Sequence, residues 1–180
     1  TNHSIVDAAA LAIYSPAGVV VHTGDFKVDY TPIFGDAIDL QRFAEIGKKG
    51  VLALMCDSTN AIRPGFTQSE VKVAKTIEGL FSDYDDKRMI ITTFASNVDR
   101  VQQIINSAYK YGRKVAVEGR SMVNIMQVSQ ELGYINMPEG TLIDIDKINI
   151  NDDSTIYLYR GAEATLNVTS VIYRHITKIT

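Results

Sequence analysis

A histidine and an aspartate near the start of the chain have the chemistry of metal ligands. His3 stands in "NHS" and Asp25 stands in "TGD", 22 positions further on. Imidazole nitrogen and carboxylate oxygen both bind zinc and manganese, and a carboxylate can bridge two ions. Two ligands do not complete a tetrahedral zinc site, however, and an aspartate after a glycine is common in an ordinary turn. These residues alone leave both a metal site and a plain turn open.

Short polar clusters follow the apolar runs of the second half of the chain. They are Asp57-Ser58-Thr59-Asn60, Ser96-Asn97, Gly119-Arg120-Ser121 and Arg160-Gly161. If those runs are parallel strands, the clusters lie along one carboxyl edge, where open α/β sheets bind their ligands. Ser96, Asn97 and Ser121 would also stand at helix N-termini, whose free N–H groups favour phosphate. The same residue types are ordinary helix caps, so capping alone is the alternative.

The elements that would position these residues follow from the apolar pattern. In the first part, "ALAIYS" (10–15) and "GVVVHT" (18–23) are joined by "SPAG", whose proline and glycine favour a hairpin turn. "LQRFAEIGKKG" (40–50) is a helix candidate closed by Gly50. A β-rich segment with one short helix is therefore expected over the first 50 residues or so.

From Val51 onward, strand candidates alternate with amphipathic helices. The strands are "VLALM" (51–55), "RMIITTF" (88–94), "KVAVEG" (114–119) and "STIYLY" (154–159). Thr67 and Glu70 match a capping box that would start the first helix, with Phe66 and Val71 as its hydrophobic staple. Such alternation predicts a parallel α/β sheet built from right-handed crossovers.

Composition limits the class of protein. The chain has 180 residues, 46% of them hydrophobic and 22% charged, with a net charge of −3. It therefore has no overall positive field to attract nucleic acid, although a local basic groove is compatible with these totals. The single cysteine, Cys56, excludes an internal disulfide and is expected to be packed rather than reactive. No membrane span or secretion signal is visible, so a cytoplasmic location is expected.

Several quoted segments together resemble a known family. "NHSIVDA", "VVHTGDFKVD", "LALMCDSTNA", "ITTFASNVDRVQQIINSAYKYGRKVAVEGRSM" and "ELGY" look like ribonuclease J, in the β-CASP branch of the metallo-β-lactamase superfamily. The likeness runs in order over about residues 1 to 148. It implies a metal-dependent bacterial ribonuclease, acting both as an endonuclease and as a 5′-monophosphate-dependent exonuclease. Two zinc-class or manganese ions would activate the attacking water.

The resemblance assigns roles to individual positions. His3 matches the third metal motif of the family, and Asp25 matches the carboxylate that bridges the two ions. Asp57 matches the first β-CASP motif, an acidic residue near the active site. Ser96 falls where the family contacts RNA phosphate, and Asn97, Arg120 and Ser121 join it as expected phosphate-binding residues. Under this interpretation the strand ends in Gly-Asp because Asp25 must reach a metal site.

The sequence also departs from the family pattern. The His-x-His-x-Asp-His metal motif does not occur among its three histidines, and "YRGAEA" places Ala162 where the family has serine. His175 stands in no family motif and is not assigned as a ligand, and His22 is taken as a structural or surface residue. With two expected metal-ligand positions present, the isolated chain is expected to be inactive. Because the chain does not begin with methionine, it is expected to be processed or part of a longer protein.

The predicted fold is α/β. Residues 1–55 are expected to be a partial metallo-β-lactamase β-layer, and residues 56–180 a Rossmann-like parallel-sheet β-CASP domain with a divergent C-terminal part. RNA is the expected partner, together with self-association or contact with the rest of a parent protein. The alternative is a β-CASP module that binds RNA or protein without cutting. A nucleotide-binding domain is a third possibility, but no G-x-G-x-x-G or P-loop fingerprint is present.

Overall fold

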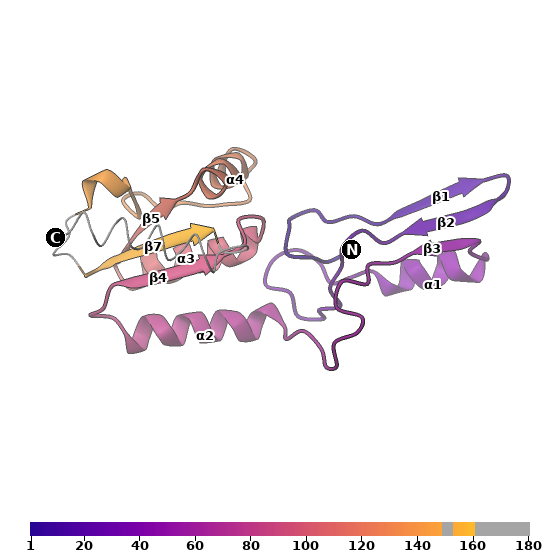
Figure 1. Ribbon diagram of the computed structural model, residues 1–180, viewed down its shortest axis with the longest axis horizontal. Helices are drawn as coiled ribbons and strands as arrows, with labels where there is room; N and C mark the ends of the chain where they lie inside the picture. The colour runs from indigo at the N-terminus through magenta and orange to yellow at the C-terminus, as the bar shows by residue number, and fades with distance from the viewer. Residues whose placement is uncertain (149–152, 161–180) are drawn as a thin grey trace. The chain divides into compact units, whose positions relative to one another are not determined.

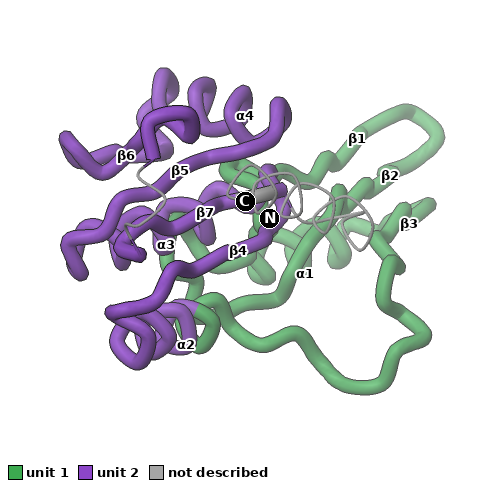
Figure 2. Tube along the Cα trace, turned by 60° about the vertical axis from the view of Figure 1, so that its left-hand side comes forward, with its two compact units in different colours: residues 1–73 green, residues 74–180 purple. Residues whose placement is uncertain are grey.

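The chain forms two compact units. The computed structural model describes residues 1–148 and 153–160, and the chain divides at residues 73 and 74 (Figure 2). This division does not test the proposed domains 1–55 and 56–180, which stay a prediction. Among the described residues, no helix has both the length and the apolar character needed to span a bilayer.

The first unit is built on a three-stranded sheet in the order β1-β2-β3 (Figure 1). Its elements are β1 (Leu11–Ser15), β2 (Gly18–His22), α1 (Leu40–Lys48) and β3 (Ala53–Met55). β1 and β2 are an antiparallel hairpin in which Ser15 pairs with Gly18, so the turn predicted from "SPAG" is confirmed. β3 pairs with β2 in parallel, and α1 lies in the connection between them. The Asp39 carboxylate caps α1 by accepting a hydrogen bond from the Arg42 N–H at 2.9 Å.

One face of this sheet carries three exposed apolar side chains. The strand register places Leu11, Ile13 and Met55 on the same face, because Leu11 and Met55 both pair with His22 and Ile13 pairs with Val20. These three residues are 60%, 53% and 56% exposed. Val21 points to the opposite face and is 3% exposed. Exposed apolar side chains of β1 and β3 thus lie on the face opposite to Val21.

The second unit contains a parallel sheet. Its elements are α2 (Glu70–Asp83, which begins in the first unit), β4 (Met89–Thr93), α3 (Val98–Lys110), β5 (Lys114–Glu118), α4 (Arg120–Glu131), β6 (Leu142–Ile143), the 3₁₀ turn η1 (Ile145–Lys147) and β7 (Thr155–Arg160). The strands lie in the order β4-β7-β5-β6, and every neighbouring pair is parallel. Figure 2 shows this order, and Figure 1 shows β7 between β4 and β5. The predicted α/β class with a parallel sheet is confirmed.

Two details of the sheet prediction are wrong. The alternation from Val51 grouped "VLALM" with the later strands, although the predicted domain 1–55 kept it apart from them, and β3 pairs with β2 of the first unit. β6 was not expected, since Leu142 and Ile143 are too short a run to stand out from the surrounding loop. The polar cluster after β3, which begins at Asp57, therefore does not share an edge with Ser96 and Ser121.

The core of the second unit lies between its sheet and its helices. Ile104 and Ile105 of α3, Val115 of β5, and Ile156 of β7 are fully buried. α3 packs against β5, and α4 packs against β5 and β7. The apolar side chains of β5 and β7 are thus buried together at paired register positions. This burial stabilises β7, the last strand in sequence, in its place between β4 and β5.

The capping box predicted at Thr67 is also wrong. α2 begins at Glu70, and the Ser69 hydroxyl accepts a hydrogen bond from the Val71 N–H at 3.3 Å. The Glu70 N–H donates to the carboxylate of Asp29 at 3.0 Å. Phe66, expected as a hydrophobic staple, is 85% exposed. Asp29, 41 positions earlier in the sequence, thus accepts the first N–H of α2 in place of the predicted cap Thr67.

Candidate functional site

The strongest candidate site is a cleft at the carboxyl ends of β2 and β3. The cleft has a volume of about 420 Å³, and Asp25 and Asp57 both line it. Thr23 joins the two strand ends, since its Oγ1 accepts a hydrogen bond from the Asp57 N–H at 3.0 Å. Its own N–H donates to the Met55 carbonyl at 3.0 Å. Parallel pairing of β2 with β3 therefore brings together two carboxylates that stand 32 positions apart in the sequence.

His3 lies beside Asp25. The two atoms His3 Nε2 and Asp25 Oδ2 are 3.9 Å apart, and the two side chains are 32% and 76% exposed. Their donor types and separation fit two ligands of one zinc or manganese ion. Within residues 1–148 and 153–160, no three or more His, Cys, Asp or Glu side chains are arranged to hold a metal. The described residues thus offer two positions of such a site and do not complete it.

Asp57 is held as a carboxylate by its own loop. Its Oδ1 accepts hydrogen bonds from the Thr59 hydroxyl at 2.6 Å and from the Thr59 N–H at 2.9 Å. These bonds are the main reason that the pKa of Asp57 is lowered, with smaller contributions from the Phe26 backbone and the charge of His3. Asp57 is therefore suited to accept hydrogen bonds or bind a cation in its ionised form.

Two further residues line the cleft that the sequence did not assign to it. Cys56 was expected to be packed, but it is exposed, and it directly follows β3, whose three residues are all exposed. His22, the last residue of β2, also borders the cleft. Neither residue carried a signal in the sequence, because strand ends are located only to within a few positions.

The expected phosphate-binding residues lie at the carboxyl edge of the second sheet. Arg120 and Ser121 are the first residues of α4, directly after β5. The N-cap of this helix is Gly119, with φ +97° and no side-chain hydrogen bond to the helix. Arg160, at the end of β7, donates from Nη1 to the Ser121 Oγ at 3.1 Å. Arg160, which the sequence already placed at this edge, thus contacts Ser121.

Ser96 and Asn97 follow the neighbouring strand β4. Asn97 is the N-cap of α3, accepting a hydrogen bond from the Arg100 N–H at 3.1 Å, and is 3% exposed. Ser96 is half-buried beside it. The strand order β4-β7-β5 places Arg160 on the strand between these residues and Ser121. Asn97 has the capping function that was the alternative in the sequence analysis, and its side-chain oxygen is occupied by the hydrogen bond from Arg100.

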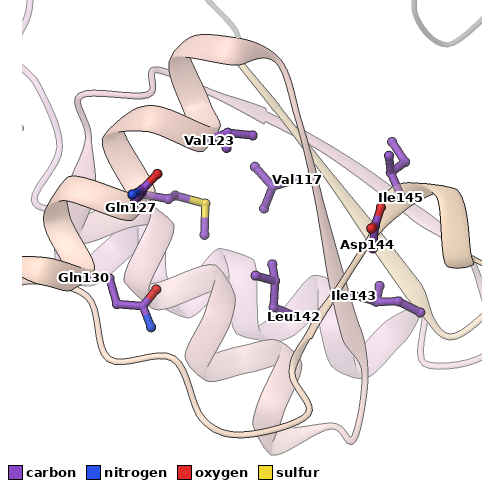
Figure 3. Close-up of a pocket in the computed structure, with 9 residues that line it drawn as sticks. Val117, Val123, Gln127, Gln130, Leu142, Ile143, Asp144 and Ile145 are labelled. Atoms are coloured by element: carbon purple, nitrogen blue, oxygen red, sulfur yellow. The ribbon is translucent and has the colours of Figure 1, made fainter.

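A second cavity lies elsewhere in the second unit. It has a volume of about 360 Å³ and is bordered by α4, β5 and β6, with Val117, Met126 and Leu142 among its apolar residues. Figure 3 shows Gln127 and Gln130 on the helix side and Asp144 near η1. None of the predicted site residues lines this cavity. Its apolar character distinguishes it from the cleft that holds Asp25 and Asp57.

Comparison with known proteins agrees with this architecture. Residues 86–172 match the family model described as "Ribonuclease J, beta-CASP domain". A ribonuclease J from Synechocystis sp. is 47% identical over 163 residues, covering 90% of this chain and 25% of that protein. A ribonuclease J from Helicobacter pylori is 41% identical over 177 residues, covering 98% of this chain and 25% of that protein. The chain spans about a quarter of the length of these curated relatives.

A solved structure shares the fold. A protein of unknown function from Enterococcus faecalis V583 superposes with a TM-score of 0.57 at 19% identity, covering 91% of this chain and 40% of that one. The parallel sheet and its helices thus define an α/β protein with a β-CASP domain. The chain belongs to the ribonuclease J family and corresponds to a segment of its members.

Proposed function

We propose that the chain is the part of a metal-dependent ribonuclease that supplies two metal ligands and an RNA-contacting edge. The single observation that carries this proposal is the 47% identity with a ribonuclease J over 163 residues, which covers 90% of this chain. The reaction is hydrolysis of RNA phosphodiesters. Cutting inside the RNA and cutting from a 5′-monophosphate end are both proposed for the complete enzyme.

The first unit would hold the metal. His3 and Asp25 are the proposed ligands of zinc or manganese, and Asp57 is the proposed acidic residue next to them. The 3.9 Å separation of the His3 and Asp25 donor atoms and the shared cleft of Asp25 and Asp57 support this assignment. Such an ion, when bound, would lower the pKa of a coordinated water. The motif His-x-His-x-Asp-His is absent from the sequence, so the chain alone is expected not to turn over RNA.

The second unit would bind the RNA backbone. Ser96, Asn97, Arg120 and Ser121 are the residues proposed from the sequence, and Arg160 joins them through its hydrogen bond to Ser121. Among the described residues, the N-terminus of α4 has no side-chain cap, because its N-cap is Gly119. The first N–H groups of this helix and the two arginines suit a phosphate group. A module that binds RNA without cutting it is the alternative, and the same edge would serve it.

The purified chain is expected to bind a 5′-monophosphorylated RNA oligonucleotide without cleaving it, with manganese or zinc present. Arg160→Ala should weaken binding by roughly fivefold and reduce the slope of log K against log salt by about 0.7, because one cation that contacts a phosphate is lost. Binding is measured by fluorescence anisotropy at several salt concentrations, and cleavage on a denaturing gel.

Arg42→Ala provides the matched control, since Arg42 lies on α1 and pairs with Glu45. It should leave both the affinity and the salt slope unchanged. If Arg160→Ala and Arg42→Ala weaken binding equally, the second sheet edge is not the RNA site. If RNA is cleaved and a chelator stops the reaction, the expectation of inactivity is wrong and the gel distinguishes internal from terminal cutting.

We also propose that the chain self-associates through the exposed face of its first sheet. Leu11, Ile13 and Met55 are exposed apolar side chains on one face of the sheet, with His22 between Leu11 and Met55, and exposed apolar side chains of this kind favour a partner. Ile13→Lys should raise the dissociation constant of the dimer at least about tenfold, as measured by sedimentation equilibrium, because a charge would have to be buried. Ile62→Lys should not change it, since Ile62 is 96% exposed in a loop. An unchanged mass for Ile13→Lys would contradict this proposal.

A further inference from the structure

The turn that carries Asp25 is held by contacts from the two residues before it. His22 ends β2, and its Nδ1 accepts a hydrogen bond from the Gly24 N–H at 3.0 Å. An accepting Nδ1 places the proton of the neutral ring on Nε2. The imidazole therefore accepts a backbone N–H of the turn, and His22 lines the same cleft as Asp25.

Thr23 holds the same turn from inside. It is 5% exposed, and its Oγ1 donates to the Gly24 carbonyl at 2.7 Å. The same oxygen accepts the Asp57 N–H at 3.0 Å, so Thr23 ties the Asp25 turn to the Asp57 loop. A single buried hydroxyl thus links the two carboxylates of the cleft through their backbones.

Gly24, the residue between Thr23 and Asp25, has a backbone conformation and surroundings that only glycine fits. Its φ is +61°, and a Cβ built there would lie 2.8 Å from the carbonyl oxygen of Ala9. A glycine is thus required by both backbone conformation and space. Because glycine has the widest range of allowed backbone angles, Gly24 alone does not determine the backbone direction at Asp25. That direction depends on the hydrogen bonds of the neighbouring residues.

We infer that His22 is a positioning residue for Asp25: its Nδ1 fixes the Gly24 amide and thereby the direction of the Asp25 carboxylate toward His3. The inference rests on the proposed function, in which Asp25 and His3 hold a metal ion. His22 itself donates no atom to that ion. Its role matches the outer contacts of metal sites, which orient the ligands and whose loss lowers metal affinity about 10- to 100-fold.

Two substitutions separate the two ring nitrogens. Asparagine carries its side-chain oxygen at the position of histidine Nδ1, whereas glutamine carries its amide group nearer the position of Nε2. His22→Asn should therefore retain the hydrogen bond from Gly24, and His22→Gln should lose it. Because His22 is exposed, both variants are expected to fold, and their amide spectra verify this.

The test uses nuclear magnetic resonance on the purified chain. In the unsubstituted protein, ¹⁵N shifts of the His22 ring should report the Nε2–H tautomer, with a coupling across the bond to the Gly24 nitrogen. Titration with Mn²⁺ should broaden the Asp25 signal. His22→Gln should need about tenfold more Mn²⁺ for the same broadening, and His22→Asn should stay within about twofold.

The outcomes distinguish the inference from the proposal beneath it. Equal Mn²⁺ titrations for His22→Gln, His22→Asn and the unsubstituted chain would overturn the positioning role. Weaker binding by His22→Asn alone would also overturn it, because Nε2 would then be the important atom. If Mn²⁺ fails to broaden Asp25 in the unsubstituted chain, the metal proposal fails, and the ring tautomer and coupling alone then support or overturn the contact of His22 with Gly24.

Discussion

Replacing Arg113 with methionine is expected to lower the free energy of unfolding of the second unit by about 3 kcal/mol. Arg113 is 3% exposed, and its guanidinium donates to backbone carbonyls instead of solvent. Nε donates to the Ser154 carbonyl at 3.1 Å, and Nη1 donates to the Tyr84 carbonyl at 3.0 Å. Nη2 donates to the carbonyls of Asp153, at 3.3 Å, and Lys87.

These contacts join segments that are distant in the chain. Tyr84 and Lys87 follow α2, while Asp153 and Ser154 precede β7. Arg113 itself directly precedes β5, the strand that pairs with β7. Methionine would fill much of the volume but leave several part-buried carbonyls without this donor, and an unsatisfied buried group costs about 1–3 kcal/mol. Arg113 therefore anchors the residues directly before β7 to the start of β5.

Urea unfolding followed by the helical circular dichroism signal measures this effect. Arg113→Lys should still cost about 2 kcal/mol, because one ammonium cannot reach carbonyls that diverge around a planar guanidinium. Arg63→Met, at an exposed loop position, should change stability by less than about 0.5 kcal/mol. If Arg113→Lys is as stable as the unsubstituted protein, the forked geometry of the guanidinium is not what holds these segments.

The local elements could be predicted from sequence because their signals lie within a few residues. Pro16 and Gly18 identify the hairpin turn, and Asn97 identifies the start of α3. Strand order could not be predicted, because it depends on which apolar faces bury together. The position of β7 between β4 and β5, and the pairing of "VLALM" with β2, are results of packing between segments far apart in the chain.

The candidate site divides along the same line. The resemblance to ribonuclease J identified His3, Asp25 and Asp57 as candidate residues, and β2–β3 pairing explains why both aspartates line one cleft. The contribution of His22 carried no local signal, since a histidine at a strand end is usually a surface residue. Arg160 was visible as a polar residue, but its contact with Ser121 depends on the strand order.

The predicted start of α2 is wrong for a physical reason that can be tested. Thr67 and Glu70 have the spacing of a capping box, yet the Glu70 N–H is bound by Asp29. Asp29 is 4% exposed, and it also accepts from the Thr31 N–H at 3.0 Å and pairs with Lys27 at 3.4 Å. A buried carboxylate with these partners stabilises the helix start more than an exposed threonine would.

The ionisation of Asp29 should make the stability of the first unit depend on pH. Burial alone would raise the pKa of Asp29, but the N–H groups of Glu70 and Thr31, the Ser69 hydroxyl and Lys27 together lower it from 3.8 to about 2. A carboxylate whose pKa is lower in the folded state contributes stability above pH 3.8, and this contribution is lost as the pH falls toward 2. After allowance for solvent screening, the lost contribution is about 1–2 kcal/mol.

Asp29→Asn should remove this dependence and destabilise the first unit at neutral pH, by about 2 kcal/mol, because Lys27 and one N–H lose a charged partner. Urea unfolding, followed through the amide signals of Thr31 and Glu70 between pH 6 and about pH 2, gives the difference between the two proteins at each pH. That difference should be constant above about pH 4 and shrink below it, because protonation of Asp29 makes the two side chains alike. Asp36→Asn, at an exposed position, should follow the unsubstituted protein throughout. A difference that stays constant down to about pH 2 would show that the charge of Asp29 does not hold the start of α2.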